Sequence, residues 1–471
     1  MDVNNGKKVE FYGGKVLVFL PILLAIVSLF YIAKLNANIP AYWAAFLLPL
    51  IVCLFLAKDK AEYCESILRG ITNQVGGILI MAVLLAGISG AIISKSGVIS
   101  SLAAYIVQIN FIGNKFIVAT FLITCVIAFS TGTSVGTMFV IGPILYPIGY
   151  LVGATPAYLI GAIISGSAFG DNISPVSDTL IAGATTQKVE LGKLFKSRIK
   201  YTIPVMLLCT VAYSFLGSDN AAASSAGSDV QANPVTLLFI LVPVVIVTAC
   251  LLRRHLLEAF TYGIITGLVI GLVTGIFKFS DIISVPEPFG AGGLIVDGIA
   301  NSIPTVVVIM FMFAHISILQ DGGGIRLLVK SMERFVVGPR SAEAVIAIIT
   351  ILLNMATALN TAAIMGTAPL AYELGEKYGL DGCRRANIMI NSGATFNYLM
   401  PYMVPVVLGS MFSSSYAPVE NAVLVSTYEV IFSQIYPWAM LVMIVFAIST
   451  GYGRTFLPDM KPDTKKKDTR A

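Results

Sequence analysis

Long apolar runs separated by short polar segments make up most of the chain. Residues 16–33 read VLVFLPILLAIVSLFYIA, and residues 43–57 read WAAFLLPLIVCLFLA. A helix of about 20 apolar residues is long enough to cross the hydrocarbon core of a bilayer. The pattern therefore predicts an all-α polytopic membrane protein. We expect spans near residues 16–33, 41–57, 77–94, 116–130, 138–152, 157–186 (interrupted), 201–217, 235–252, 258–277, 304–320, 342–356, 363–375, 384–396 (interrupted), 401–413 and 430–450.

Polar motifs recur along the chain at a nearly constant spacing. FSTGTSVGTMFVIGPI (residues 129–144) aligns with MATALNTAAIMGTAPL (residues 355–370), at an offset of 226. SGSAFGDNISP (residues 165–175) aligns with SGATFNYLMP (residues 392–401), at an offset of 227 where both begin. Self-similarity at a fixed spacing indicates an internal duplication. We predict repeats at residues 1–217 and 235–451, a polar extracellular linker at 218–234 and a basic cytoplasmic tail at 452–471.

The basic residues of the loops predict how the spans are oriented. The segment 187–200 contains five Lys or Arg residues, whereas its counterpart, residues 414–429, contains none. Because Lys and Arg are enriched in cytoplasmic loops, the first segment should be inside and the second outside. A second pair (58–70 and 285–298) differs in the same direction, whereas in a third pair (96–113 and 323–340) the basic residues lie in the second repeat. Because every pair has opposite preferences, we predict two inverted-topology repeats with both termini cytoplasmic. Segments 116–137 and 342–362 are either full spans or re-entrant hairpins. The loop charges fit both alternatives, because both give the same parity of membrane crossings.

Composition agrees with a multi-pass protein of the cell's plasma (inner) membrane. Hydrophobic residues make up 57% of the chain and charged residues 12%, about half the charged share of a typical soluble domain. The net charge of +5 comes from basic loops and implies no nucleic-acid partner. The six cysteines are scattered and form no metal motif. We therefore expect the lipid bilayer and a small ion or molecule as partners, and no cofactor other than transported Na⁺ and H⁺.

The segment SGSAFGDNISPVSDT (residues 165–179) contains two aspartates and four serines within an otherwise apolar part of the chain. Pro175 cannot donate a backbone hydrogen bond and disrupts a continuing helix. Unwound backbone inside a bilayer is tolerated only where it lines a cavity or is buried in protein. Broken helices at matching positions of two inverted halves mark the substrate site of many transporters. We therefore predict a site at this break.

Acids inside a membrane are rare and are functional candidates by default. Asp171 and Asp178 lie at this break, and a proton and a Na⁺ ion can compete for such a carboxylate. The alternative for Asp178 is that it only caps the helix that follows. The residues that we expect to bind Na⁺ or protons are Asp171, Asp178, Asn172, Ser174, Ser177 and Thr179.

Two groups of uncharged polar residues complete the predicted site. The run STGTSVGT suits a hairpin tip that faces the same cavity, although small residues also serve helix packing in membranes. The matching residues of the second repeat are neutral, which suits a substrate or a gate. The first group is Thr131, Gly132, Thr133, Ser134 and Thr137, and the second is Thr357, Asn360, Thr361, Asn391, Ser392, Asn397 and Tyr398.

The sequence FGDNISPVSDT (residues 169–179), with FSTGTSVGT before it and SGATFNYLMP after it, resembles the NhaC family of sodium/proton antiporters. The family signature falls on Asp171, Ser174, Pro175, Ser177, Asp178 and Thr179. At Leu180 the family commonly has a second threonine. The resemblance implies inverted repeats, paired hairpins and a homodimer. The family also contains malate/lactate exchangers, so the resemblance leaves the substrate open.

Two functions fit these features, and we expect neither to be enzymatic. The first is Na⁺/H⁺ antiport by alternating access at the intramembrane carboxylates. The second is Na⁺- or H⁺-coupled transport of a small organic acid or amino acid, with Asn360, Thr361, Asn391 and Asn397 as hydrogen-bonding groups. A channel is a further alternative, which the asymmetric polar breaks disfavour. His315 is expected to be a buried histidine or a proton relay, and Arg384 and Arg385 to anchor a helix at the headgroups.

Overall fold

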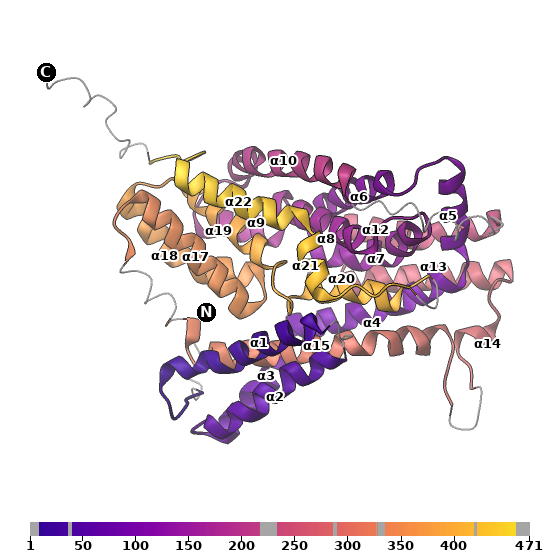
Figure 1. Ribbon diagram of the computed structural model, residues 1–471, viewed down its shortest axis with the longest axis horizontal. Coiled ribbons are helices and arrows are strands. Elements are labelled where there is room, and N and C mark those ends of the chain that lie inside the picture. Colours follow the sequence, from indigo (N-terminus) through magenta and orange to yellow (C-terminus); the bar gives the residue numbers. More distant parts are fainter. Residues whose placement is uncertain are drawn as a thin grey trace, which may run out of the picture.

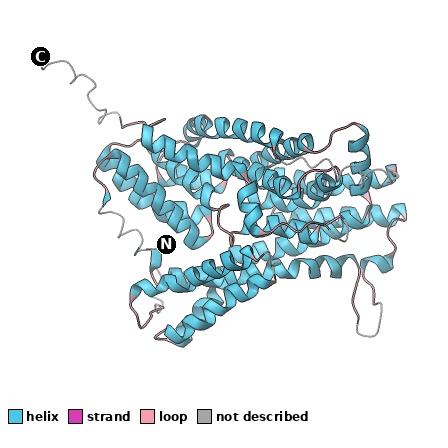
Figure 2. Cartoon of the chain, in the orientation of Figure 1, coloured by secondary structure: helices cyan, strands magenta, loops and turns pink. Residues whose placement is uncertain are grey.

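The structure is a computed structural model that describes residues 9–35, 40–216, 233–285, 290–325, 327, 335–418 and 422–457. Within these residues the fold is helical, and extended pairing is limited to isolated bridges (Figure 2). The predicted linker (218–234) lies almost entirely outside the described residues, as does most of the predicted tail (452–471). The prediction of an all-α membrane protein is confirmed.

The helices follow one another with short connections. The first part of the chain contains η1 (Lys15–Phe19), α1 (Leu20–Lys34), α2 (Ala41–Leu56), α3 (Lys60–Ile71), α4 (Gln74–Lys95), α5 (Val98–Gln108), α6 (Asn114–Thr131), α7 (Ser134–Leu151), α8 (Pro156–Ile173), α9 (Asp178–Thr186) and α10 (Leu191–Phe215). The second part contains η2 (Pro234–Ile240), α12 (Leu241–Leu251), α13 (Leu256–Thr274), α14 (Phe279–Ile282), α15 (Leu294–Asp321), α17 (Pro339–Thr357), α18 (Asn360–Tyr378), α19 (Gly382–Phe396), α20 (Val404–Ser415), α21 (Thr427–Ser433) and α22 (Ile435–Thr450).

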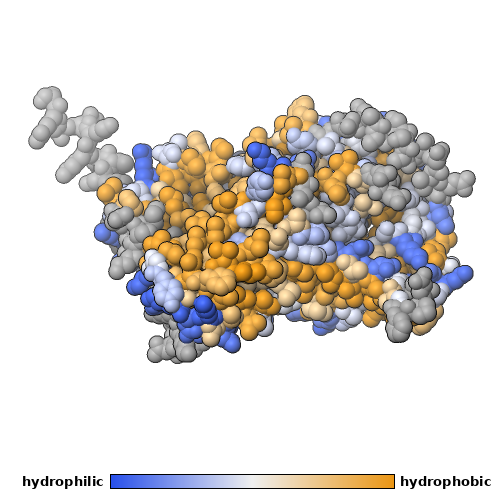
Figure 3. Space-filling model, turned by 60° about the horizontal axis from the view of Figure 1, so that its bottom comes forward, coloured by the Kyte–Doolittle hydropathy of each residue, from blue (hydrophilic) through white to orange (hydrophobic). Residues whose placement is uncertain are grey.

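Eight helices of the described chain are long and apolar enough to cross a membrane, and the bent pair α21–α22 would make a ninth. Many helices run along the long axis of the molecule, which is horizontal in Figure 1. Large apolar side chains remain exposed on them, for example Val126 on α6 and Val273 on α13. Figure 3 shows these apolar residues as a broad band, with hydrophilic residues gathered toward both ends. The chain is a multi-pass membrane protein.

The helix bounds recur at the spacing found in the sequence. The first residue of α17 lies 225 residues after the first residue of α6, and its last residue lies 226 residues after the last residue of α6. Helices α18, α19 and α20 begin 226 residues after α7, α8 and α9, respectively. This correspondence supports the predicted duplication. The inversion of one half relative to the other, and the division between the halves, stay predictions.

Two predicted segments differ in detail from the structure. Of residues 187–200 only 187–190 form a loop, because α10 begins at Leu191 and continues to Phe215. The span predicted at 430–450 is broken into α21 and α22, which are bent by 56° at Gln434. The segments 116–137 and 342–362 each consist of one helix and the start of the next, joined by two residues. Helices α6 and α17 are long enough to span, and a re-entrant arrangement stays a prediction.

Close packing of α8 against α6 fixes the position of the predicted site. A Cβ atom on Gly170 would lie 2.3 Å from the Cβ of Ala128, and one on Gly166 would lie 2.6 Å from the carbonyl oxygen of Phe121. Small residues let membrane helices approach in this way. Helix α8 also contacts α7, α10, α20, α21 and α22, so the predicted site lies among helices of both parts of the chain.

Candidate ion site at the break between α8 and α9

The predicted interruption is present at residues 174–177. Helix α8 ends at Ile173 and α9 begins at Asp178. The Ser174 hydroxyl accepts from the Val176 N–H (3.3 Å), and the Ser177 hydroxyl accepts from the Thr179 N–H (3.3 Å). These side chains bond backbone groups that the break frees from the helix, as helix termini require. The break is thus an ordered turn that the side chains of Ser174 and Ser177 stabilise.

Asp171 is the centre of a group of oxygen-bearing side chains. The Ser177 hydroxyl donates to Asp171 Oδ1 at 2.7 Å and lies 2.9 Å from the Thr179 hydroxyl. Ser134, the first residue of α7, lies beside the same carboxylate. Carboxylate and hydroxyl oxygens are ligands that hard cations prefer. The arrangement can hold either a proton or a small cation on Asp171.

The tip between α6 and α7 packs directly on this break. Gly132 has φ +70°, and a Cβ atom there would lie 2.8 Å from the Val176 side chain and 3.0 Å from the Ser177 nitrogen. Thr131 and Thr137 join their hydroxyls across the tip at 3.0 Å. The predicted hairpin tip therefore lies against the segment that holds Asp171.

The second part of the chain contributes a tyrosine to the same site. Tyr398, in the connection between α19 and α20, lies near Ser134 and Asn397 and close enough to Asp171 for the two groups to interact electrostatically. Its hydroxyl is buried without a hydrogen-bond partner in the described chain. The side-chain amide of Gln434 donates to the carbonyl of Tyr398. Gln434 is the residue at which α21 and α22 are bent. Three interrupted segments thus meet near one carboxylate.

Arg198 was not among the predicted site residues. The sequence placed it in a cytoplasmic basic loop, but it is fully buried on α10. It bonds both the backbone carbonyl and the side-chain oxygen of Asn172, the residue after Asp171. It also donates to Asn387 and Asn391 on α19. The positive-inside rule counts a basic residue without regard to burial, so it misassigned this one.

The structure separates some predicted residues from this group. Asp178, the first residue of α9, is exposed and does not share hydrogen bonds with Asp171. Thr133 is exposed at the tip, where its carbonyl accepts from Thr137 (2.7 Å). Four predicted residues lie at the second tip or on α19 and do not hydrogen-bond Asp171: Thr357, Asn360, Thr361 and Ser392.

The second tip, between α17 and α18, repeats the first with different residues. Ala358 adopts φ +49° at the position that matches Gly132. A Cβ atom on Gly393 would lie 2.0 Å from the Asn360 side-chain oxygen, so α19 packs closely on this tip. Buried oxygens without a hydrogen-bond partner in the described chain include those of Asn354, Asn360 and Ser392. This neutral polar group is suited to hydrogen-bond an uncharged or anionic group.

A cavity of about 560 Å³ reaches the first tip and the break. Thr131 and Thr133 line it from the tip, and Pro175 and Val176 line it from the break. Arg253 and Arg254, between α12 and α13, line it as well. Val176 packs on Gly132 and precedes Ser177, whose hydroxyl bonds Asp171. The cavity therefore ends beside the segments that hold Asp171, although Asp171 itself does not line it.

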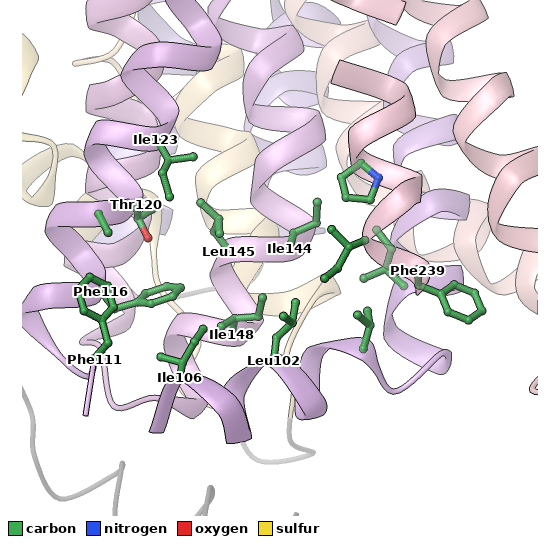
Figure 4. A pocket seen from close by; sticks show the side chains of 15 residues that line it. Leu102, Ile106, Phe111, Phe116, Thr120, Ile123, Ile144, Leu145, Ile148 and Phe239 are labelled. Carbon is green, nitrogen blue, oxygen red and sulfur yellow. The ribbon is translucent and has the colours of Figure 1, made fainter. Parts of the chain in front are cut away.

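A second cavity, of about 380 Å³, is apolar. Leu102 of α5, Phe116 of α6 and Leu145 and Ile148 of α7 gather around it, and the Thr120 hydroxyl is the polar group shown there (Figure 4). No acid or base lines it. It is unsuited to binding a cation.

The other buried arginines form ion pairs. Arg384 bonds both carboxylate oxygens of the fully buried Glu343 at 2.8 and 3.0 Å, and Arg454 bonds the same oxygens at 2.8 and 2.6 Å. Arg385 pairs with Glu376 at 3.1 Å. The expectation that Arg384 and Arg385 anchor at headgroups is wrong, because both are buried. His315 is buried, and its Nδ1 lies 2.9 Å from the carbonyl of Phe311.

The replacement Arg454→Gln is expected to destabilise the protein without unfolding it. Glu343 would lose two charge-assisted hydrogen bonds but keep those from Arg384, so we expect a loss of about 1–3 kcal/mol. Thermal unfolding of the purified protein in detergent measures this. Arg254→Gln is the control, because Arg254 is exposed and lies 3.9 Å from Glu258; exposed pairs contribute little. Equal melting temperatures for both variants would contradict the structural role of Arg454.

Interrupted helices that meet at an acid inside a polytopic helical protein are the architecture of a secondary transporter. The model of the Na⁺/H⁺ antiporter family matches residues 12–218 and 221–453, and the chain belongs to this family. Its relatives include the Na⁺/H⁺ antiporter NhaC of Alkalihalophilus pseudofirmus, which is 24% identical over 85% of this chain and 89% of that protein.

A malate-2H⁺/Na⁺-lactate antiporter of Bacillus subtilis is also 24% identical, over 96% of this chain and 97% of that protein. Among solved structures, the YdaH transporter of Alcanivorax borkumensis is 15% identical, covers 93% of this chain and 98% of its own, and has a TM-score of 0.40. The relatives named here are transporters, and the family assignment rests on sequence.

Proposed function

We propose that the protein exchanges Na⁺ for H⁺ at Asp171 by alternating access. The observation that carries this proposal is the meeting of the Asp171 carboxylate with the hydroxyls of Ser177 and Ser134 at a break in the helix, with the Thr179 hydroxyl bonded to Ser177. A proton and a Na⁺ ion can each neutralise this carboxylate, and the site cannot hold both in the same place. Binding of one therefore displaces the other.

The cavity beside the break supports a route to one side of the membrane. It is lined by Arg253 and Arg254, and the positive-inside rule places such residues in the cytoplasm. The proposed state is therefore open toward the cytoplasm as far as the contact of Gly132 with Val176. We further propose the plasma (inner) membrane, cytoplasmic termini and, from the family resemblance, a homodimer.

A second candidate function is coupled transport of a small organic anion. Two features favour it: the basic residues Arg253 and Arg254 at the cavity, and the neutral polar group around Asn354, Asn360 and Ser392. A relative of nearly equal length is named as a malate/lactate antiporter. Asp171 would then bind only the coupling ion.

A flux assay in proteoliposomes separates the two functions. The wild-type protein is reconstituted with a pH-sensitive dye inside, and Na⁺ is added outside without any organic acid. The Na⁺/H⁺ antiporter is expected to move protons at once, and addition of malate or lactate should change nothing. If Na⁺ alone evokes no proton movement but labelled malate or lactate enters in a Na⁺-dependent way, the first proposal is wrong and the second is supported.

A further inference from the structure

Arg198 is a buried cation that hydrogen-bonds only neutral groups. Its side chain is 0% exposed. Nε donates to the Asn172 carbonyl at 2.8 Å, and Nη2 donates to the Asn172 side chain and, at 2.8 Å, to Asn391. Nη1 donates to Asn387 at 3.2 Å. These four residues, Arg198, Asn172, Asn387 and Asn391, are called the Arg198 cluster below.

A guanidinium buried in this way is normally paired with a carboxylate, because a buried charge without a counter-charge is strongly unfavourable. Arg384 and Arg385 follow this rule through Glu343 and Glu376. In the described part of the chain, Arg198 has no carboxylate within hydrogen-bonding distance. Asn172, to which Arg198 donates twice, directly follows Asp171, so the Asp171 carboxylate lies close enough for the two charges to interact.

We propose that Arg198 is a positioning residue for the ion site, which holds the end of α8 against α19 and acts as the fixed counter-charge of Asp171. This inference rests on the proposed exchange of Na⁺ at Asp171. The surrounding ionisable groups are Asp178 on α9, Tyr201 on α10, Tyr398 after α19 and Tyr436 on α22. Asp178 is exposed, so Arg198 is the buried charge that balances Asp171 when the site is empty.

The two roles of Arg198 predict different effects of its removal, one on Na⁺ affinity and one on the transport rate. As a fixed positive charge near the site, it weakens the binding of a second cation. Its removal should therefore lower the Na⁺ concentration at half-maximal effect, by about three- to tenfold for charges at the effective dielectric of a protein interior. Because Arg198 also holds the end of α8 against α19, its removal should lower the transport rate. A residue that is merely structural would leave the affinity unchanged or weaken it.

The experiment compares Arg198→Gln and Arg198→Lys with the wild type in two assays on the full chain. One assay measures the KM for Na⁺ and the maximal rate of Na⁺-driven proton movement in proteoliposomes. The other is the Na⁺ concentration that gives half-maximal thermal stabilisation of the purified protein, which reports binding to the folded state. We expect a lower half-maximal Na⁺ concentration and a lower rate for Arg198→Gln. Arg198→Lys should keep the wild-type affinity at a reduced rate.

Two substitutions at Asn387 test the charge without removing Arg198. Asn387→Asp preserves shape and places a carboxylate beside Nη1. The Ser197 hydroxyl, which accepts from the Asn387 amide and donates to the Leu194 carbonyl, would have to turn to donate to this carboxylate. It should lower the half-maximal Na⁺ concentration as Arg198→Gln does, even if Arg198→Gln fails to fold. Asn387→Ala is the matched control, because it removes the hydrogen bond from Arg198 Nη1 and adds no negative charge. The affinity of this variant for Na⁺ should therefore not rise.

The inference is overturned if Asn387→Asp, and Arg198→Gln where it folds, bind Na⁺ no more tightly than the wild type. Failure of the proposed function gives a different result. If Na⁺ stabilises the wild-type protein but moves no protons, antiport is wrong, and the binding assay still decides the role of Arg198. If Na⁺ neither stabilises the protein nor moves protons, both proposals are wrong.

Discussion

Asp171→Asn is expected to abolish Na⁺-evoked proton movement in proteoliposomes, by about a hundredfold or more. Asparagine can still accept the hydrogen bond that the Ser177 hydroxyl donates at 2.7 Å. It can neither carry a proton nor offer a negative charge to Na⁺. A hundredfold loss corresponds to about 2.7 kcal/mol, which is reasonable for removal of the charged ligand of a partly buried cation site. The readout is the initial rate of dye fluorescence after addition of Na⁺.

The control for this variant is an acid that lies outside the site. Asp297, in the first turn of α15, is exposed. Asp297→Asn should keep a rate close to that of the wild type. Asp178→Asn should have an intermediate effect, because Asp178 is exposed but its charge still acts on Asp171. A rate for Asp171→Asn that matches the rate for Asp297→Asn would show that exchange takes place elsewhere.

Gly132→Ala is expected to reduce transport at least tenfold and to destabilise the protein. The residue has φ +70°, where an L-residue other than glycine is strained by about 1–2 kcal/mol. Its new Cβ would also lie 2.9 Å from the backbone carbon of Val176 and 3.0 Å from the Ser177 nitrogen. Backbone atoms cannot rotate away, so the tip or the break must shift. A shift of Ser177 would move the hydroxyl that bonds Asp171.

Two further substitutions test whether this effect depends on position. A Cβ atom on Gly77, in α4, would have no atom within 4 Å, so Gly77→Ala should leave rate and melting temperature nearly unchanged. Ala358, at the matching tip, already has φ +49° as an alanine. Ala358→Gly should therefore relieve strain and leave transport intact. Wild-type rates for Gly132→Ala would contradict the proposed contact between tip and break.

The interruption of α8 could be predicted because its causes are local. Pro175 lacks an N–H, and the serines around it compete with the helix for backbone groups. The break also reverses the chain locally, so Ser177, six residues after Asp171, can reach the carboxylate. Recurrence of the polar motifs predicted a second interruption within residues 384–396, but α19 is continuous from Gly382 to Phe396 and the break follows it.

Contacts between distant segments could not be predicted in this way. Arg198 belongs to a basic run, and its charge alone indicates a loop; only the fold shows that α10 carries it next to Asn172 and α19. In the sequence, only Gln434 and Pro437 indicate the break at Gln434. The apolar residues around them favour a continuous span, so the break was missed. The meeting of Tyr398 with Asp171 depends on the packing of α8 and α19, and no local pattern reports it.

The central claim is that Na⁺ and H⁺ compete for the carboxylate of Asp171. Its most direct test is the release of protons from the purified protein in weakly buffered detergent solution when Na⁺ is added. We expect the wild type to release protons in a saturable way, choline as a control cation to release none, and Asp171→Asn to release none on addition of Na⁺. Equal proton release from Asp171→Asn and the wild type would show that Na⁺ and H⁺ do not compete at Asp171.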